Sequence, residues 1–256
     1  MSRQNRAQRI WRDKPCIFCG GHRLAQGIEH APPKIIFKNK QRAKGFEFPA
    51  CDRCNGGSSR IDQLFALLAL SQAPEALSRT TKPSDYDHKV INGTANNSPF
   101  LYQNTKPVLS QDRFGKLTPA HQIELRPEVS SQAAIWVAKQ TLALWYEHTG
   151  QIASHRAIIE VDIFTNARMP EKDIIAAIRS IRTSGSLGAP GETTSKQFCY
   201  KIDFDCEKKW AAVFARYHSG FGFMSILNDR SSAKLSKGKL KYRFGTNAHR
   251  GIYRLK

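Results

Sequence analysis

The chain has 256 residues, of which 40% are apolar, and its 40 Lys and Arg residues outnumber its 21 Asp and Glu residues. This length and composition are typical of a folded protein with one large domain or two small ones. No apolar run approaches the roughly 18 residues of a membrane span, and the polar start of the chain lacks the apolar core of a secretory signal. We therefore expect a cytoplasmic protein with no membrane partner.

The charge is the first indication of a partner. The net charge of +19 and the isoelectric point near 9.9 favour a polyanion. Residues 1–60 hold 13 Lys and Arg against 4 Asp and Glu, and residues 228–256 hold 9 against 1. No basic amphipathic helix with a lipid-facing stripe stands out. We therefore expect nucleic acid as the partner, DNA rather than RNA.

The first half of the chain divides into three parts. Residues 1–13 form a basic tail, interpreted either as a solvated segment or as a helix that holds phosphates. Residues 14–72 contain paired cysteines, followed by an apolar pattern over 60–70 that predicts a buried helix. Residues 73–128 are rich in Pro, Asn, Asp, Ser and Gly, which predicts an irregular connector with short hairpins at most. The ligand-like run Asp85-Tyr-Asp-His88 is interpreted as a loop within it.

Residues 129–256 predict an α+β domain with an antiparallel sheet and a basic C-terminal tail. The clearest helix covers 129–149, with Ser130 or Ser131 as its cap. Further elements are expected at 157–164 (strand), 171–181 (helix), and 196–205, 209–217 and 221–227 (strands). We expect this domain to choose the substrate or to bind a protein partner or regulator.

Four of the six cysteines form two CxxC pairs, Cys16 with Cys19 and Cys51 with Cys54. In a cytosolic chain such pairs indicate metal more often than disulfides. Each CxxC is a tight turn that directs two thiolates at one ion, so two turns complete a tetrahedral zinc site. A closed site of four thiolates has no open coordination position, which predicts a structural zinc. His22, close to the first pair, is interpreted as a surface residue rather than as a ligand.

The segment between the two pairs contains Gly27-Ile-Glu-His-Ala-Pro-Pro33, and Asn55 directly follows the last cysteine. This order resembles the HNH, or ββα-metal, endonuclease family over residues 16–59. In that family a CxxC pair precedes an acid–His pair and a nearby Pro, and a second CxxC is followed by His or Asn. The resemblance implies a zinc-pinned ββα-metal nuclease domain over 14–72 that hydrolyses phosphodiester bonds in DNA. The remaining residues resemble the long extensions of bacterial and phage HNH proteins, which suggests a phage-defence or mobile-element setting.

The resemblance also implies roles for three residues: His30 as the general base, and Glu29 and Asn55 as ligands of a catalytic Mg²⁺ or Mn²⁺. Hydrolysis needs an attacking hydroxide, which a His can generate near neutral pH. A cation stabilises the charge that develops on the phosphate, and a carboxylate and an amide oxygen suit Mg²⁺ or Mn²⁺. Adjacent strand residues point to opposite faces, so Glu29 and His30 converge only if the hairpin bends.

One position departs from the family pattern. The family usually carries an Asn about five residues before the third cysteine, whereas here Lys44-Gly-Phe-Glu-Phe-Pro-Ala50 contains none. That Asn supports the catalytic His in many members, and Glu47 or a backbone carbonyl is the candidate substitute. The alternative function is a zinc-stabilised nucleic-acid-binding protein without catalysis.

Two groups of basic residues are expected to contact the nucleic acid. The group within the motif contains Lys34, Lys38, Lys40 and Arg42, and the C-terminal group contains Lys237, Lys239, Lys241 and Arg243. The C-terminal group alternates with apolar residues, so its cations would share one face of a strand along a phosphate backbone. The other interpretation is an ordinary half-buried strand with a solvated face.

Overall fold

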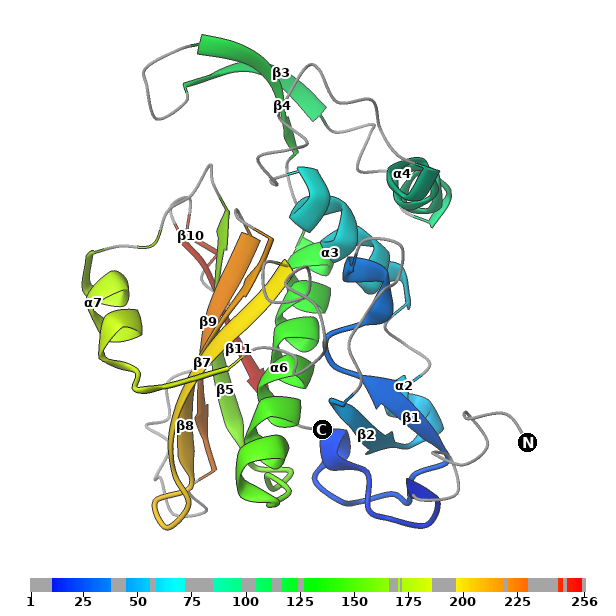
Figure 1. Cartoon of the computed structure of the whole chain (residues 1–256), viewed down its shortest axis with the longest axis vertical. Coiled ribbons are helices and arrows are strands. Elements are labelled where there is room, and N and C mark those ends of the chain that lie inside the picture. The colour runs from blue at the N-terminus through cyan, green and yellow to red at the C-terminus, as the bar shows by residue number, and fades with distance from the viewer. Residues whose placement is uncertain are drawn as a thin grey trace.

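The computed structural model describes residues 11–37, 45–55, 59–71, 85–97, 105–111, 117–123, 127–165, 170, 172–185, 197–218, 221–229, 244–245 and 248–254. The fold is α+β, as the sequence predicts. An N-terminal module that contains both CxxC turns, called the knuckle module below, and an antiparallel sheet lie on opposite sides of one long helix (Figure 1). Within the described residues, no helix combines the length and the apolar character needed to cross a membrane.

The N-terminal module is a strand pair followed by a short helix. Its elements are η1 (Ile17–Cys19), β1 (Gly27–His30), η2 (Lys34–Ile36), β2 (Glu47–Ala50) and α2 (Asp52–Asn55). Strands β1 and β2 are antiparallel, with Gly27 opposite Ala50 and His30 opposite Glu47. This pairing places the acid–His pair on β1 and the second CxxC at the end of β2.

The segment expected to be an irregular connector contains a helix, so that expectation is wrong over part of its length. Helix α4 (Asp85–Asn97) packs on α3 (Ser59–Ser71), and it includes the run interpreted as a loop. Its Asn, Gly and Thr residues have low helix propensity. Burial of Val90 and Thr94 compensates, since both are at most 1% exposed and tertiary packing supplies most helical stability in proteins.

The same segment contains one short hairpin, as expected. Strands β3 (Thr105–Gln111) and β4 (Leu117–Ile123) pair along their full length at one end of the molecule (Figure 1). The next helix, α6 (Pro127–Thr149), begins earlier than predicted. Proline is favoured in the first turn of a helix because the N–H that it lacks would have no partner there. Since α6 begins at Pro127, Ser130 and Ser131 lie inside the helix and do not cap it.

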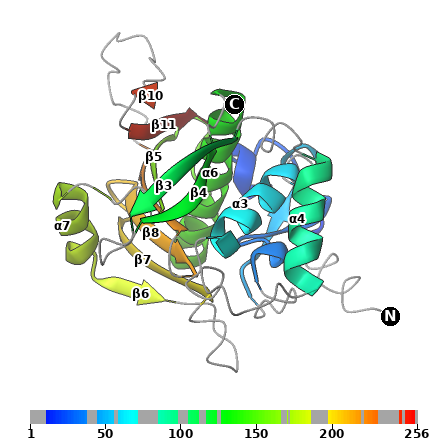
Figure 2. The same cartoon turned by 90° about the horizontal axis from the view of Figure 1, so that it is seen from above.

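The C-terminal part forms one antiparallel sheet, which confirms the prediction. Its described strands are β5 (Ile158–Thr165), β6 (Thr183–Gly185), β7 (Phe198–Asp205), β8 (Trp210–Tyr217), β9 (Phe221–Asn228), β10 (Phe244–Gly245) and β11 (Ala248–Arg254). They are ordered β10-β11-β5-β9-β8-β7-β6. Helix α6 crosses one face of the sheet, and α7 (Lys172–Ser180) lies at its other side (Figure 2).

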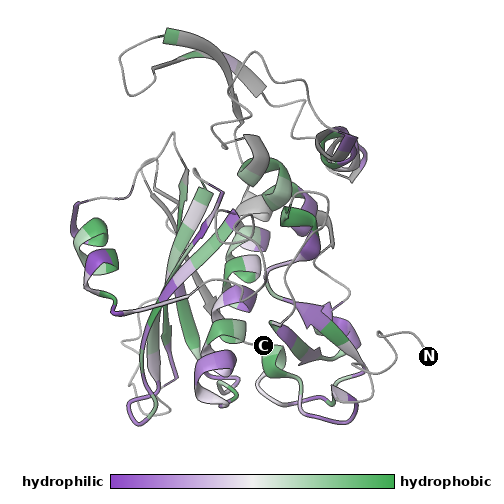
Figure 3. Ribbon diagram, in the orientation of Figure 1, coloured by the Kyte–Doolittle hydropathy of each residue, from purple (hydrophilic) through white to green (hydrophobic). Residues whose placement is uncertain are grey.

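A continuous apolar core joins the two parts. Phe65 of α3 stacks on Trp136 of α6 with ring centroids 4.2 Å apart. Nε2 of His218 lies 3.0 Å from the carbonyl oxygen of Ile36, which connects the end of β8 to η2. Figure 3 shows hydrophobic residues running along the sheet strands that face α6. The knuckle module therefore completes its core with residues far along the chain.

Candidate functional site

Two tight turns position the four paired cysteines. In the first, Gly20 has a φ of +67° after η1, and the N–H of Gly21 donates to the carbonyl of Cys16 at 3.0 Å. In the second, the N–H groups of Cys54 and Asn55 both donate to the carbonyl of Cys51 at 2.9 Å. A left-handed φ costs glycine little, so the first turn reverses at the residue best suited to it.

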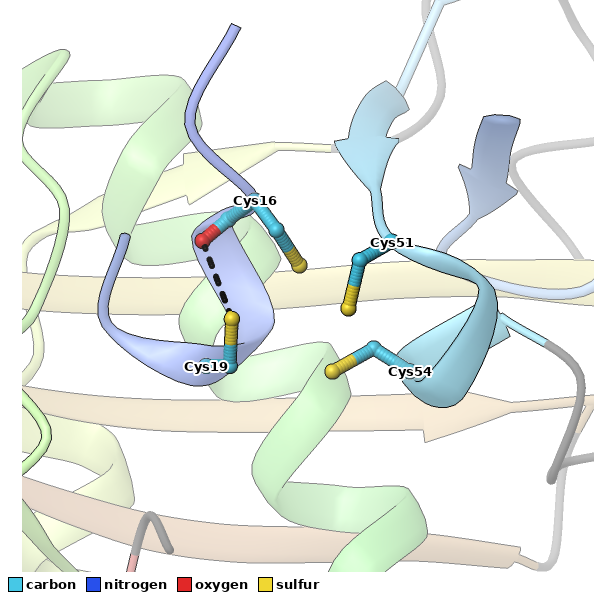
Figure 4. A group of neighbouring side chains, drawn as sticks. All are labelled: Cys16, Cys19, Cys51 and Cys54. Carbon is cyan, nitrogen blue, oxygen red and sulfur yellow. Dashed lines mark hydrogen bonds between the residues drawn. The ribbon is translucent and has the colours of Figure 1, made fainter. Parts of the chain in front are cut away.

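The four thiols converge on one point (Figure 4). Their sulfur atoms all lie within 4.8 Å of one another; Cys16, Cys19 and Cys51 are buried, and Cys54 is half-buried. A Zn–S bond of about 2.3 Å in a tetrahedron places sulfurs about 3.8 Å apart. The cluster thus has a suitable size and donor set for a metal ion, which fits the predicted four-cysteine zinc site.

The thiols interact electrostatically as a group. A hydrogen bond with the Cys54 thiol lowers the pKa of Cys16 to about 5, and the same contact raises the pKa of Cys54. Burial, followed by the charge on Cys16, raises the pKa of Cys19. Each ionised sulfur therefore opposes ionisation of its neighbours, and a bound cation is what allows all of them to be thiolates.

The two residues of the acid–His pair lie on opposite faces of β1. Glu29 points inward and is 7% exposed, and its Oε2 lies 2.9 Å from Nζ of Lys139. Burial raises the pKa of Glu29, and the nearby ammonium of Lys139 opposes that shift. His30 points to the other face, as strand alternation requires. Glu29 and His30 therefore do not converge.

His30 lies next to the candidate substitute for the missing Asn. Its Nε2 is 3.4 Å from Oε1 of Glu47, its direct neighbour across the hairpin. Beyond this pair, the N–H of Ala31 donates to the carbonyl of Phe46 at 3.3 Å and closes the end of the ladder. A carboxylate beside an imidazole fixes the orientation of the ring.

Asn55 lies on the same side of β1 as Glu29. A Cβ atom added to Gly27 would be 2.9 Å from Nδ2 of Asn55, and Gly27 shares its strand face with Glu29. Two of the three predicted catalytic residues thus lie on one side of β1, with His30 on the other face. Because Glu29 already binds an ammonium, the arrangement does not fit a divalent cation held by Glu29 beside His30.

Lys139 is a residue that the sequence reading missed. It is 7% exposed in the middle of α6, and its Nζ donates to the carbonyl of Cys54 at 2.8 Å besides pairing with Glu29. The same ammonium lies 5.5 Å from the centre of the Phe18 ring. In the sequence, Lys139 is the single charged residue within the apolar run 133–145. Because a buried Lys requires a partner, its position there could have indicated a buried ion pair.

The loop before β5 also contacts the turn that contains the first CxxC pair. The exposed rings of His22 and His155 meet with centroids 4.7 Å apart. A Cβ atom on Gly20 would lie 2.5 Å from the backbone nitrogen of His155. That loop is anchored by Ser154, whose N–H donates to Oδ2 of Asp229 at 2.8 Å.

Of the predicted nucleic-acid contacts, the structure describes Lys34, which is exposed on η2. The others lie outside the described residues: Lys38, Lys40, Arg42, Lys237, Lys239, Lys241 and Arg243. The Arg residues of the N-terminal tail before position 11 do so as well. Their role in binding stays a prediction.

Comparison of the chain with protein-family models, with curated proteins and with solved structures finds no match.

Proposed function

We propose that this chain is a zinc-stabilised, metal-dependent HNH-type endonuclease that hydrolyses phosphodiester bonds in DNA. The observation that supports it best is the His30–Glu47 pair on a hairpin whose neighbouring turns bring four cysteines together. The order of motifs along residues 16–59 and the net charge of +19 agree with this function.

In the proposed reaction, His30 is the general base. Its imidazole takes a proton from water, and the resulting hydroxide attacks phosphorus as the P–O bond to the leaving oxygen breaks. The leaving oxygen then takes up a proton from solvent water, and the imidazolium returns its proton to solvent. Glu47 orients the ring and stabilises the imidazolium that forms, which is the role of a carboxylate behind a catalytic His.

Zinc has a structural role in this proposal. Cys16, Cys19, Cys51 and Cys54 would hold Zn²⁺ in a closed site, which would join the chain before β1 to the chain after β2 at the open end of the hairpin. The hairpin carries His30, so loss of zinc is expected to abolish activity through the fold. Structural zinc binding is coupled to folding in small modules of this kind.

A requirement for Mg²⁺ or Mn²⁺ is part of the proposal, since such an ion stabilises negative charge on the scissile phosphate. The family resemblance implies Glu29 and Asn55 as the ligands of this ion. Because Glu29 is buried against Lys139 at 2.9 Å, the proposal assigns no protein ligand to the ion. Lys34 and the basic groups at both ends of the chain are proposed to hold the DNA backbone.

The test is plasmid cleavage with Mg²⁺ or Mn²⁺ by the full chain, with and without His30→Ala. The matched control is His88→Ala, because His88 is an exposed histidine on α4 away from the hairpin. Wild type and the His88 variant should cut, and the His30 variant should bind DNA and retain zinc without cutting. Equal cleavage by the His30 variant would overturn the mechanism.

The second candidate function is a zinc-stabilised protein that binds nucleic acid without cutting it. Two observations favour it: the middle Asn is absent, and the Glu29 carboxylate is engaged by Lys139. DNA binding by the wild-type chain, without cleavage under any divalent cation, would support this function. Cleavage only after another protein is added would instead indicate a partner-activated nuclease.

A further inference from the structure

The Lys139 ammonium lies where three parts of the molecule meet. It extends from the middle of α6 to the carboxylate of Glu29 on β1 at 2.9 Å and to the carbonyl of Cys54 in the second knuckle at 2.8 Å. Both charged side chains are less than 10% exposed. One ammonium thus binds the hairpin and the knuckle at the same time.

The negative charges around the Lys139 ammonium explain why a positively charged side chain is needed there. A zinc ion with four thiolates carries a net negative charge, and Glu29 adds a carboxylate on the adjacent strand. Buried charges are tolerated when they are paired and hydrogen-bonded. Lys139 supplies the opposite charge to Glu29 and a donor to the Cys54 carbonyl, and groups around the ligands of a metal commonly set how tightly it is held.

We propose that Lys139 is a positioning residue that holds the second knuckle against β1 and slows the loss of zinc, with Glu29 serving as its buried counter-ion. In this arrangement the Glu29 carboxylate does not bind the catalytic divalent cation. The inference rests on the zinc site of the proposed function, and is independent of whether His30 acts as a base.

The burial of the Lys139–Glu29 pair is the reason why Glu29 is not expected to bind the catalytic divalent cation. A divalent cation at Glu29 would have to displace the ammonium and leave Lys139 buried without its counter-ion. Breaking a buried ion pair in this way is strongly unfavourable. Mg²⁺ also gives up its water ligands reluctantly, and a carboxylate that is 7% exposed offers little room for a hydrated ion.

The first experiment measures the rate at which zinc passes from the full chain to a chromogenic chelator. Lys139→Met keeps the length of the side chain and removes its charge, whereas Lys139→Arg keeps the charge. The matched control is Lys208→Met, since Lys208 is an exposed lysine paired with Asp205. Zinc release should be about 10- to 100-fold faster in Lys139→Met, less so in Lys139→Arg, and unchanged in Lys208→Met. An unchanged rate in Lys139→Met would overturn the proposal.

A double variant covers the case in which Lys139→Met does not fold. Glu29→Gln with Lys139→Met removes both charges and leaves no unpaired buried ion, so this chain should fold. It should still release zinc faster than wild type, because the Cys54 carbonyl has lost its donor. Folding with wild-type zinc retention would contradict the proposed role of Lys139.

The second experiment measures Mn²⁺ binding to the zinc-loaded chain by electron paramagnetic resonance. Glu29→Gln should leave Mn²⁺ affinity unchanged and speed zinc release. Loss of Mn²⁺ binding with unchanged zinc release would show that Glu29 is a catalytic-cation ligand, and would overturn this inference. His30→Ala should hold zinc and Mn²⁺ as wild type does, so failure of the nuclease mechanism is detected separately.

Discussion

Nε2 of His30 lies 3.4 Å from Oε1 of Glu47, directly across the β1–β2 hairpin. The family that the motif resembles usually has an Asn in this segment, and here a carboxylate meets the histidine instead. The pair lies on the strand face opposite Glu29. In the proposed mechanism the base is therefore supported from within its own hairpin.

The first prediction concerns Glu47→Gln, which removes the charge and keeps the shape of the side chain. DNA cleavage should fall by about 10-fold or more, which is less than the roughly 100- to 10,000-fold expected for loss of the base in His30→Ala. Zinc content and DNA affinity should not change. The assay is plasmid cleavage, with Glu207→Gln as the control because Glu207 is exposed beyond β7. Full activity of Glu47→Gln would remove Glu47 from the mechanism.

The second prediction concerns zinc itself. Elemental analysis of the purified chain should find about one zinc per molecule. Cys51→Ser should lose most of it and unfold at a lower temperature, since Cys51 is 1% exposed at the junction of β2 and α2. Cys199→Ser, which is outside the cluster, is the control. Full zinc content in Cys51→Ser would show that the four-cysteine assignment is wrong.

The third prediction compares two glycines with nearly the same backbone. Gly20 has a φ of +67° and Gly150 has a φ of +66°, so an alanine is strained at either position. A Cβ at Gly20 would also lie 2.5 Å from the backbone nitrogen of His155, whereas at Gly150 no atom lies within 4 Å. Gly150→Ala should cost about 1–2 kcal/mol from the left-handed conformation alone.

Gly20→Ala should therefore cost more than Gly150→Ala, because the loop carrying His155 must move away from the knuckle. Denaturant unfolding of the zinc-loaded chain measures both values. Equal losses of stability would mean that the loop yields without cost, and that it does not support the knuckle.

The fourth prediction concerns pH. Burial lowers the pKa of His148 below its ordinary value of 6.5, and its Nε2 lies 3.0 Å from the hydroxyl of Tyr200. A histidine whose pKa is lower in the folded chain favours unfolding once it is protonated, so its cost is absent above pH 6.5 and grows as pH falls below that value. His148→Gln should flatten the fall in melting temperature below pH 6.5. An unchanged pH profile would mean that His148 is not linked to stability.

Local spacing made the four-cysteine cluster predictable, whereas the contacts around it depend on the fold. A CxxC pair directs two thiols to one point within a single turn, so the four cysteines could be assigned without knowing any long-range contact. The Glu47 contact depends on strand register, and only a candidate could be named beforehand. The Lys139 contact joins residues 85 positions apart, and no periodicity in the sequence reports such a pair.

The helices and strands also divide into those that the local sequence predicts and those that depend on contacts with distant residues. Strands β5, β7, β8 and β9 were predicted because a strand with alternating burial, as in β7 and β8, has a matching pattern of residue types in its own sequence. Helix α4 was missed because its stability comes from contacts with α3 and not from its own residues. Thr94 illustrates this, as its hydroxyl lies 3.3 Å from the carbonyl of Gln63 on α3.

The separation between Cys54 and Lys139 also has a consequence for synthesis of the chain. All four clustered cysteines precede position 55, and their ammonium contact comes 85 residues after the last of them. A ribosome therefore completes both knuckles well before it makes the helix that contacts them. In the proposed function, a nascent chain would capture zinc during that interval with the cysteines alone, and the later arrival of α6 would be the step that holds the captured ion in place.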